Sequence, residues 1–359
     1  MSAPLELHGL TQAELGALMA RWGQPAFRAK QLFAFLHRGL PFEAMHTLPA
    51  ALRERLRREA AGRPVETLEI RRSALDGTIK LLYRLRDGHV IEGVLMRYRH
   101  GVTLCLSTQV GCAMGCVFCA STLEGKARDL TAAEMTGQVL CANAALEPGE
   151  SVHNVVLMGS GEPLDNYGHT VRFLRLLRDP AGLNIGLRNV SLSTCGLVPQ
   201  MLELAEEGLP VTLSVSLHAP NDGIRRTLMP VARAYPMDEL LDACRSYVGK
   251  TGRRVVFEYA LVRGVNDAPE HARELAGRLR GLQCHVNLIP LNAIVSGIME
   301  ERGLRASGPR EVRAFQAQLE QLRISVTLRR EMGGDIQGAC GQLRRAFLAQ
   351  NIVESTGED

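Results

Sequence analysis

The chain of 359 residues lacks several features that would assign it to a common class of protein. No uninterrupted apolar run is long enough to cross a bilayer. Residues 1–10 lack the basic start and apolar stretch of a secretory signal. There is also no internal repeat and no low-complexity tract. We therefore expect a cytoplasmic protein without a membrane segment, in which cysteines stay reduced unless one pair has a redox role.

Lysine is scarce, which makes the basic charge of the chain almost entirely arginine. Four of the 42 basic residues are lysine and the other 38 are arginine, and the formal net charge is only +4. Arginine suits bidentate recognition of phosphate, so the bias is compatible with RNA binding. A GC-rich genome that favours arginine codons explains the same bias.

The first hundred residues divide into a helical part and a strand part. Residues 11–62 show apolar residues at helical period, and Thr11 and Glu14 have the spacing of a capping box. Residues 65–97 change towards a period of two, with turn dipeptides at Asp76-Gly77 and Asp87-Gly88. We predict a helical accessory domain that binds RNA over 1–64 and a small antiparallel β-extension over 65–97.

Strands and helices alternate from about residue 101 onwards. Six such alternations predict parallel βα units of an α/β protein, either a doubly wound sheet or a barrel. Six strands leave a barrel incomplete and open on one side to a large substrate. The predicted core covers 98–334, followed by a C-terminal tail over 335–359. The candidate strands are 102–107, 154–159, 189–194, 211–218, 254–262 and 285–290, with a possible seventh at 324–330.

Three cysteines lie within eight positions, directly after the first of these strands. Cys112, Cys116 and Cys119 have the spacing C-x3-C-x2-C, and the other six cysteines are scattered singly. A closed zinc site takes four ligands. Three thiolates and an open fourth position instead suit a 4Fe-4S cluster that awaits an external ligand. The alternative from another class is a non-catalytic RNA-binding protein, in which a distant cysteine completes a structural zinc site.

The cysteine motif, with an aromatic residue before its last cysteine, resembles that of radical S-adenosylmethionine enzymes. Five segments in order resemble the bacterial family that methylates carbon 2 of adenine in both ribosomal and transfer RNA. They are "GCAMGCVFCAST", "MGSGEP", "VSLHAPND", "VNLIPLN" and "GDIQGACGQL". The resemblance extends over nearly the whole chain and implies a partial (βα)6 radical S-adenosylmethionine barrel.

The resemblance also implies cofactors, partners and a reaction. The cofactors are one 4Fe-4S cluster and two molecules of S-adenosylmethionine per turnover, a methyl donor and a radical source. The expected substrates are 23S ribosomal RNA and the anticodon loop of transfer RNA, and an electron donor such as flavodoxin or ferredoxin is required. A monomer is expected. The implied cofactor-binding residues are Gly161, Glu162, Ser193, Ser216, Leu217, His218 and Asn292.

Three further residues match the family's reacting groups. Cys340 matches the cysteine that accepts a methyl group, and Cys105 matches the cysteine that releases the product through a disulfide with Cys340. Glu92 matches the proton acceptor at the adenine carbon, although an acidic residue on a half-exposed strand is usually only solvated. A related family that methylates adenine carbon 8 in ribosomal RNA and confers antibiotic resistance shares the cluster and both cysteines. No physical feature of the sequence separates the two.

Overall fold

A single mixed sheet forms the centre of the computed structural model, which describes residues 4–291, 302–330, 332–336, 343–344 and 347. Its strand order is β1-β2-β3-β4-β7-β8-β9-β10-β11-β12. The pairs from β1 to β4 are antiparallel and the pairs from β4 to β12 are parallel. The strands are β1 (Val65–Arg72), β2 (Ile79–Leu85), β3 (Val90–Tyr98), β4 (Gly101–Cys105), β7 (Val152–Leu157), β8 (Val190–Thr194), β9 (Thr212–Ser216), β10 (Val255–Leu261), β11 (Cys284–Pro290) and β12 (Val326–Leu328).

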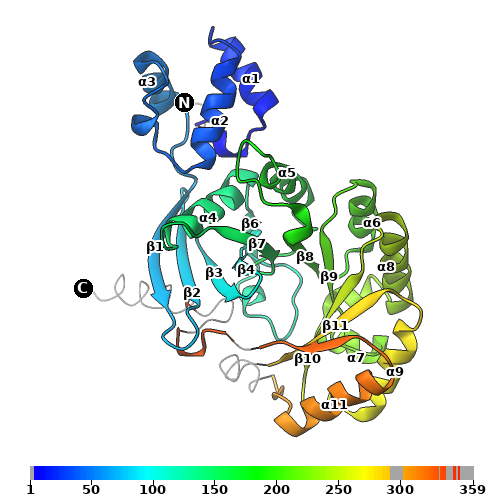
Figure 1. The fold of residues 1–359 in the computed structure, drawn as a ribbon. Coiled ribbons are helices and arrows are strands. Elements are labelled where there is room, and N and C mark those ends of the chain that lie inside the picture. Colours follow the sequence, from blue (N-terminus) through cyan, green and yellow to red (C-terminus); the bar gives the residue numbers. More distant parts are fainter. Residues whose placement is uncertain (1–3, 292–301, 331, 337–342, 345–346, 348–359) are drawn as a thin grey trace.

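Helices cover the outer side of the parallel strands, which curve into a partial barrel (Figure 1). No helix in the described part of the chain is long and apolar enough to cross a membrane. The helices of this layer are α4 (Ala132–Ala144), α5 (Tyr167–Leu177), α6 (Val198–Glu206), α7 (Asp222–Leu228), α8 (Met237–Thr251), α9 (Pro269–Leu279) and α11 (Pro309–Gln321).

The predicted fold is confirmed in its main features. All six predicted core strands form, and the possible seventh forms as β12, paired in parallel with β11. The predicted meander is β1 to β3, and both of its turns carry a glycine at positive φ, 70° at Gly77 and 88° at Gly88. In one respect the structure differs from a β-extension that stands apart from the core. β3 pairs with β4, so the meander and the barrel are one continuous sheet.

The two faces of this sheet differ in chemistry. Successive side chains of a strand point to opposite faces, and residues paired across strands share a face. On β8, Val190 and Leu192 belong to the apolar core under the helices, whereas Ser191 and Ser193 point to the inner face. Parallel strands are normally apolar on both faces. The inner face of this barrel is instead polar at the positions of these two serines.

The N-terminal helices α1 (Gln12–Arg21), α2 (Phe27–His37) and α3 (Ala50–Glu59) stand above α4 and α5 (Figure 1). The predicted capping box of Thr11 and Glu14 is present at the start of α1. Polar contacts of Gln12, and of Arg172 with Gly9 and Glu14, join this helical part to the barrel. Gln12 donates to the Asp179 carboxylate at 2.9 Å, and the Arg172 guanidinium donates to the Gly9 carbonyl at 2.6 Å. Apolar side chains of the helical part belong to the same core cluster as the barrel, so the two pack as one body.

A buried histidine in this helical part makes the protein sensitive to acid. Burial, helped by nearby His37 and Arg63, lowers the pKa of His8 from 6.5 to about 3. Between these values the unfolded chain binds a proton that the folded protein does not, so stability falls as the pH falls. We expect His8 to remove roughly 2 kcal/mol of stability between neutral pH and about pH 5.

The measurement is the free energy of unfolding in urea at a series of pH values. His8→Gln should flatten the loss of stability below pH 6.5, whatever its effect at neutral pH. The same substitution at His89, which is exposed, serves as the control. A pH dependence equal in the wild type and in His8→Gln would contradict the prediction.

Candidate active site

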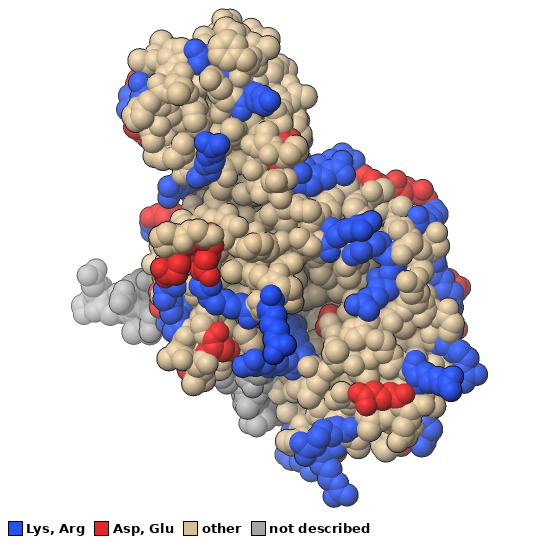
Figure 2. All heavy atoms as spheres, viewed as in Figure 1, with Lys and Arg blue, Asp and Glu red and all other residues tan. Residues whose placement is uncertain are grey.

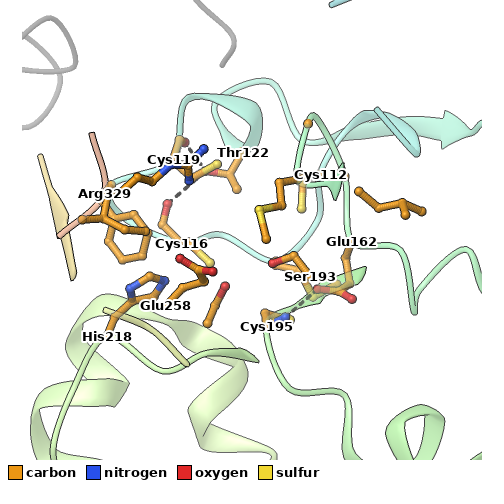
Figure 3. A pocket seen from close by; sticks show the side chains of 18 residues that line it. Cys112, Cys116, Cys119, Thr122, Glu162, Ser193, Cys195, His218, Glu258 and Arg329 are labelled. Atoms are coloured by element: carbon orange, nitrogen blue, oxygen red, sulfur yellow. Dashed lines mark hydrogen bonds between the residues drawn. The ribbon is translucent and has the colours of Figure 1, made fainter. Parts of the chain in front are cut away.

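A cavity of about 220 Å³ opens at the carboxyl ends of the central strands (Figure 3). In parallel α/β folds this end of the sheet carries the chemistry, because loops from neighbouring strands meet there. Figure 2 shows the same side of the molecule as Figure 1, with lysine and arginine side chains gathered around its hollowed middle. The cavity is lined by Cys112, Met114, Cys116, Phe118, Cys119, Thr122, Leu157, Met158, Gly159, Gly161, Glu162, Ser193, Cys195, Ser216, His218, Glu258, Ile289 and Arg329.

The three predicted cluster cysteines all lie on one wall of this cavity (Figure 3). They belong to the loop between two short strands, β5 (Gln109–Gly111) and β6 (Lys126–Asp129), which the sequence analysis did not predict. The Thr122 hydroxyl ties the loop together by donating to the carbonyls of Cys119 at 2.9 Å and Cys116 at 3.2 Å. The loop therefore presents three thiols from a backbone that is held by its own hydrogen bonds.

The environment of these thiols suits ligands that ionise only when a cation binds. Burial, together with the neighbouring thiols, raises the pKa of Cys112 to about 11 and raises that of Cys116 further. A metal centre supplies the positive charge that releases the thiol protons. Within the described residues, no three His, Cys, Asp or Glu side chains are placed to hold a single metal ion.

Gly161 and Glu162 form the turn after β7, beside the cysteine loop. Gly161 has φ of 111°, and a Cβ there would lie 2.7 Å from Thr108 and Gln109, so the turn requires glycine. The buried Glu162 carboxylate accepts backbone N–H bonds from Leu164 at 3.0 Å and Cys195 at 2.7 Å. Glu162 thus joins the loops after β7 and β8 and shapes the floor of the cavity.

Ser193 and Ser216 line the cavity from the ends of β8 and β9. In each strand polar residues alternate with apolar ones, and these two serines belong to the polar set. Both hydroxyls therefore lie on the inner face. Leu217 belongs instead to the apolar core and does not line the cavity. Its contribution is a backbone N–H that donates to the Glu258 carbonyl at 3.0 Å.

His218 presents a neutral ring with one defined tautomer. Its Nδ1 accepts the Ala260 backbone N–H at 2.9 Å, so in the neutral ring the proton is on Nε2. Burial lowers the pKa of His218 to about 3, which keeps the ring uncharged. The residue has φ of 55°, an unusual value for a side chain that is not glycine, and its ring meets Phe118 edge-on at 4.7 Å. The ring is therefore positioned as a hydrogen-bond donor.

Cys105 and Glu92 lie outside the cavity lining but on the same face of the sheet. Cys105 on β4 is paired with Val94 on β3, and Glu92 stands two residues before Val94 on that strand. Both are buried, so Glu92 is not the solvated residue that the alternative interpretation expected. Its carboxylate lies 3.2 Å from the ammonium of Lys80, which is fully buried on β2. The continuous sheet thus extends the inner face of the barrel to both residues.

Two predicted residues cannot be placed in the site. Asn292 and Cys340 lie outside the described residues. Asn287, on the same segment as Asn292, lies on β11 and donates to the Glu258 carboxylate at 3.1 Å. The described cysteines form no disulfide with one another.

Sequence reasoning missed several residues of the cavity, among them Cys195, Arg329 and Glu258. Cys195 was interpreted as a small core residue, yet it lines the cavity and donates its N–H to Glu162. Arg329 follows β12, far along the chain, and nothing in the sequence indicates its return to the site. Glu258 had a usable signal, since it is a single carboxylate inside the apolar strand "VVFEYAL".

The partial barrel and its three-cysteine cavity define a radical S-adenosylmethionine enzyme, and the family model of the radical SAM superfamily matches residues 106–276. A second model, of the ribosomal RNA large subunit methyltransferase N-terminal domain, matches residues 5–61. The chain belongs to the RlmN family of radical S-adenosylmethionine methyltransferases. This membership decides for an enzyme over a non-catalytic zinc protein.

Similar proteins cover almost the whole chain. A probable dual-specificity RNA methyltransferase RlmN of Lachnospira eligens is 48% identical over 98% of this chain and 99% of its own length. A relative of the same name from Symbiobacterium thermophilum is 51% identical over 94% and 91%. The crystal structure of a radical SAM methyltransferase from Sphaerobacter thermophilus is 45% identical, with a TM-score of 0.88 over 94% of this chain and 99% of that one.

Membership in the superfamily implies a 4Fe-4S cluster and S-adenosylmethionine, and the cavity fits both. Three thiols face it from one loop, leaving a fourth iron of such a cluster open to an external ligand. Beyond the thiols it offers hydroxyls, a neutral imidazole and a buried carboxylate oxygen that has no partner among the described residues. A polar ligand of nucleoside size would supply those groups with partners.

Proposed function

We propose that the protein methylates carbon 2 of one adenine in 23S ribosomal RNA and of one adenine in the anticodon loop of transfer RNAs. One observation supports this most: Glu92 and Cys105 lie on the face of the sheet that also forms the three-cysteine cavity. A proton acceptor and a thiol thereby stand beside the place where a radical would be formed. Ordinary methyl transfer cannot reach adenine carbon 2, because this carbon is electron-poor.

In the proposed reaction Cys340 carries the methyl group. When bound, the cluster and two molecules of S-adenosylmethionine supply this methyl group and then a radical that removes one of its hydrogen atoms. The resulting methylene on the Cys340 sulfur bonds to adenine carbon 2 and links protein to RNA. A thiolate is the form that accepts the methyl group.

Glu92 removes the proton from adenine carbon 2 in this proposal, and the unpaired electron left on the adduct would return to the cluster that supplied it. The Glu92 carboxylate is held in place by the buried Lys80 ammonium, and it also accepts the backbone N–H of Arg344. Arg344 stands four residues after Cys340, so Glu92 binds the chain next to the acceptor cysteine. A base that also anchors this segment keeps the adenine, the methyl carrier and the proton acceptor together.

Cys105 completes the reaction by releasing the product. Its thiolate attacks the Cys340 sulfur, forming an S–S bond and breaking the bond between sulfur and the methylene carbon. The electron pair of that broken bond and one proton complete the methyl group on adenine. The disulfide must then be reduced before another turnover, which suits a cytoplasmic location.

The helical domain of residues 1–64 is proposed to bind RNA through phosphates. Helix α3 carries four arginines, of which Arg57 and Arg58 are exposed. Arg55 instead stacks on Trp22 at 4.5 Å and pairs with Glu59 at 3.1 Å, so part of this charge is structural. The protein acts as a monomer in this proposal and takes electrons from a flavodoxin or ferredoxin.

One assay tests the position of methylation. The holoprotein, a reductant and S-adenosylmethionine are incubated with a 23S ribosomal RNA fragment and separately with transfer RNA, and both are digested to nucleosides. We expect 2-methyladenosine from both substrates. Product from ribosomal RNA alone would contradict dual specificity. An 8-methyladenosine peak would replace the proposal by the related resistance activity, which the same cluster and cysteines support.

A further inference from the structure

Arg225 is a buried cation that the proposed reaction does not use. It lies on α7, is fully buried, and is not among the residues that line the cavity. Its guanidinium donates to the backbone carbonyls of Cys195 at 2.8 Å and Tyr235 at 3.2 Å, and its Nε–H has no partner among the described residues. In this part of the chain the side chain thus bonds to carbonyls and to no carboxylate. A buried charge without a counter-charge is costly.

Helix α7 packs against the loop that carries the cluster cysteines. The Leu228 carbonyl, three residues after Arg225, accepts the backbone N–H of Val117 at 3.0 Å. Leu228 also belongs to one apolar cluster with Cys116 and Cys195. Residues three apart on a helix are neighbours on its surface. Arg225 therefore stands on the side of α7 that meets the cysteine loop and the loop after β8.

The charge of Arg225 acts on a cluster ligand from this position. Burial raises the pKa of the Cys116 thiol, and the Arg225 cation opposes that rise. Burial lowers the pKa of Arg225, and the Cys195 and Asp222 groups oppose this fall. An arginine nevertheless stays protonated in proteins. Because water and salt screen buried charges only weakly, a fixed positive charge faces the cysteine wall from behind.

We propose that Arg225 is the counter-charge of the 4Fe-4S cluster and raises the reduction potential of that cluster. The inference rests on the proposed function, since it requires the cluster. Three thiolates give the bound cluster a net negative charge, and each electron taken from the donor protein makes it more negative. A fixed cation stabilises the reduced form more than the oxidised form, because net charge and surroundings set the potential of such clusters. Arg225 thereby makes the cluster easier to reduce by a flavodoxin or ferredoxin.

The test measures the reduction potential of the cluster in the absence of S-adenosylmethionine and RNA. Protein with a reconstituted cluster is held at a series of solution potentials, and the reduced fraction is read from its electron paramagnetic resonance signal. Arg225→Gln and Arg225→Met both remove the charge. At a fixed potential we expect the ratio of reduced to oxidised cluster to fall about tenfold in each, which is a shift of about 59 mV to more negative potential for a one-electron couple.

Arg225→Lys separates the charge from the hydrogen bonds. Lysine keeps the positive charge but loses the planar fork that bonds to two carbonyls, so the potential should stay close to that of the wild type. Arg226→Gln, an exposed change at the next position of α7, is the control and should leave the potential unchanged. The signal counts only protein that holds a cluster, so partial loss of iron does not alter the measured potential.

An unchanged potential in Arg225→Gln and Arg225→Met would overturn the inference. An equal shift in Arg225→Lys would overturn it as well, since the effect would then come from the lost hydrogen bonds. In both cases the proposed function would stand, because the cluster is present. A wild-type protein that binds no cluster on reconstitution would instead overturn the proposed function.

Discussion

Cys105→Ala is expected to convert the enzyme into one that stays covalently attached to its RNA. In the proposed reaction the bond between the Cys340 sulfur and the adenine can form without Cys105, because Cys105 acts only at release. Without its thiolate the carbon–sulfur bond has no nucleophile to break it. Cys105 is buried on β4 beside Val94 and Val156, so alanine leaves a small void and little other change.

The adduct is measured after one reaction with labelled RNA, as a shift in a denaturing gel, and is confirmed by mass on the peptide containing Cys340. Cys340→Ala, alone or combined with Cys105→Ala, should give no adduct and no methylated RNA while keeping the cluster. Cys244→Ala is the matched control, since this cysteine is also buried but lies away from the cavity. Equal adduct in the wild type and in Cys105→Ala would show that Cys105 does not release the product.

Cys116→Ala is expected to remove the cluster and with it all activity. The three thiols of the loop are its only protein ligands in our proposal, and two thiolates do not retain a 4Fe-4S cluster at a site that already leaves one iron open. Anaerobically prepared wild type should be brown and contain about four irons per chain. The variant should be colourless and contain almost none.

Cys195→Ala gives a stringent control within the same cavity. Cys195 is as buried as Cys112 and Cys116 and lines the same space, but it stands in the loop after β8 and holds Glu162 through its backbone N–H. Alanine preserves that N–H, so the iron content should stay at about four per chain. Loss of iron from Cys195→Ala, or retention of the full content by Cys116→Ala, would show that the ligand set is different.

Much of the fold could be predicted because its signals are local. The glycine turns at Gly77 and Gly88 and the capping box at Thr11 depend on a few adjacent residues, and each forms as expected. The seven parallel strands were visible as short apolar segments between helical ones. The pairing of β3 with β4 was not visible, because strand order depends on contacts between segments that sequence periodicity does not report.

The sequence by itself determined the class of chemistry. The spacing of Cys112, Cys116 and Cys119 brings three thiols together in one loop, and a loop needs no distant partner to do so. Ser193 and Ser216 were likewise within reach of sequence reasoning, since serine alternates with apolar residues along their strands. These features depend only on residues within short segments, so they form in any fold that contains the same loop and the same strands.

Only the tertiary structure decided which distant residues complete the site. Strand register places Glu258 opposite Ser216. The last strand of the sheet, β12, brings Arg329 to the same cavity. The burial of Glu92 beside Lys80 follows from the pairing of β2 with β3. A shift of one residue in register would turn these side chains to the other face. The physical reason is that register and burial depend on the packing of the whole sheet. A short segment of the sequence does not contain this information.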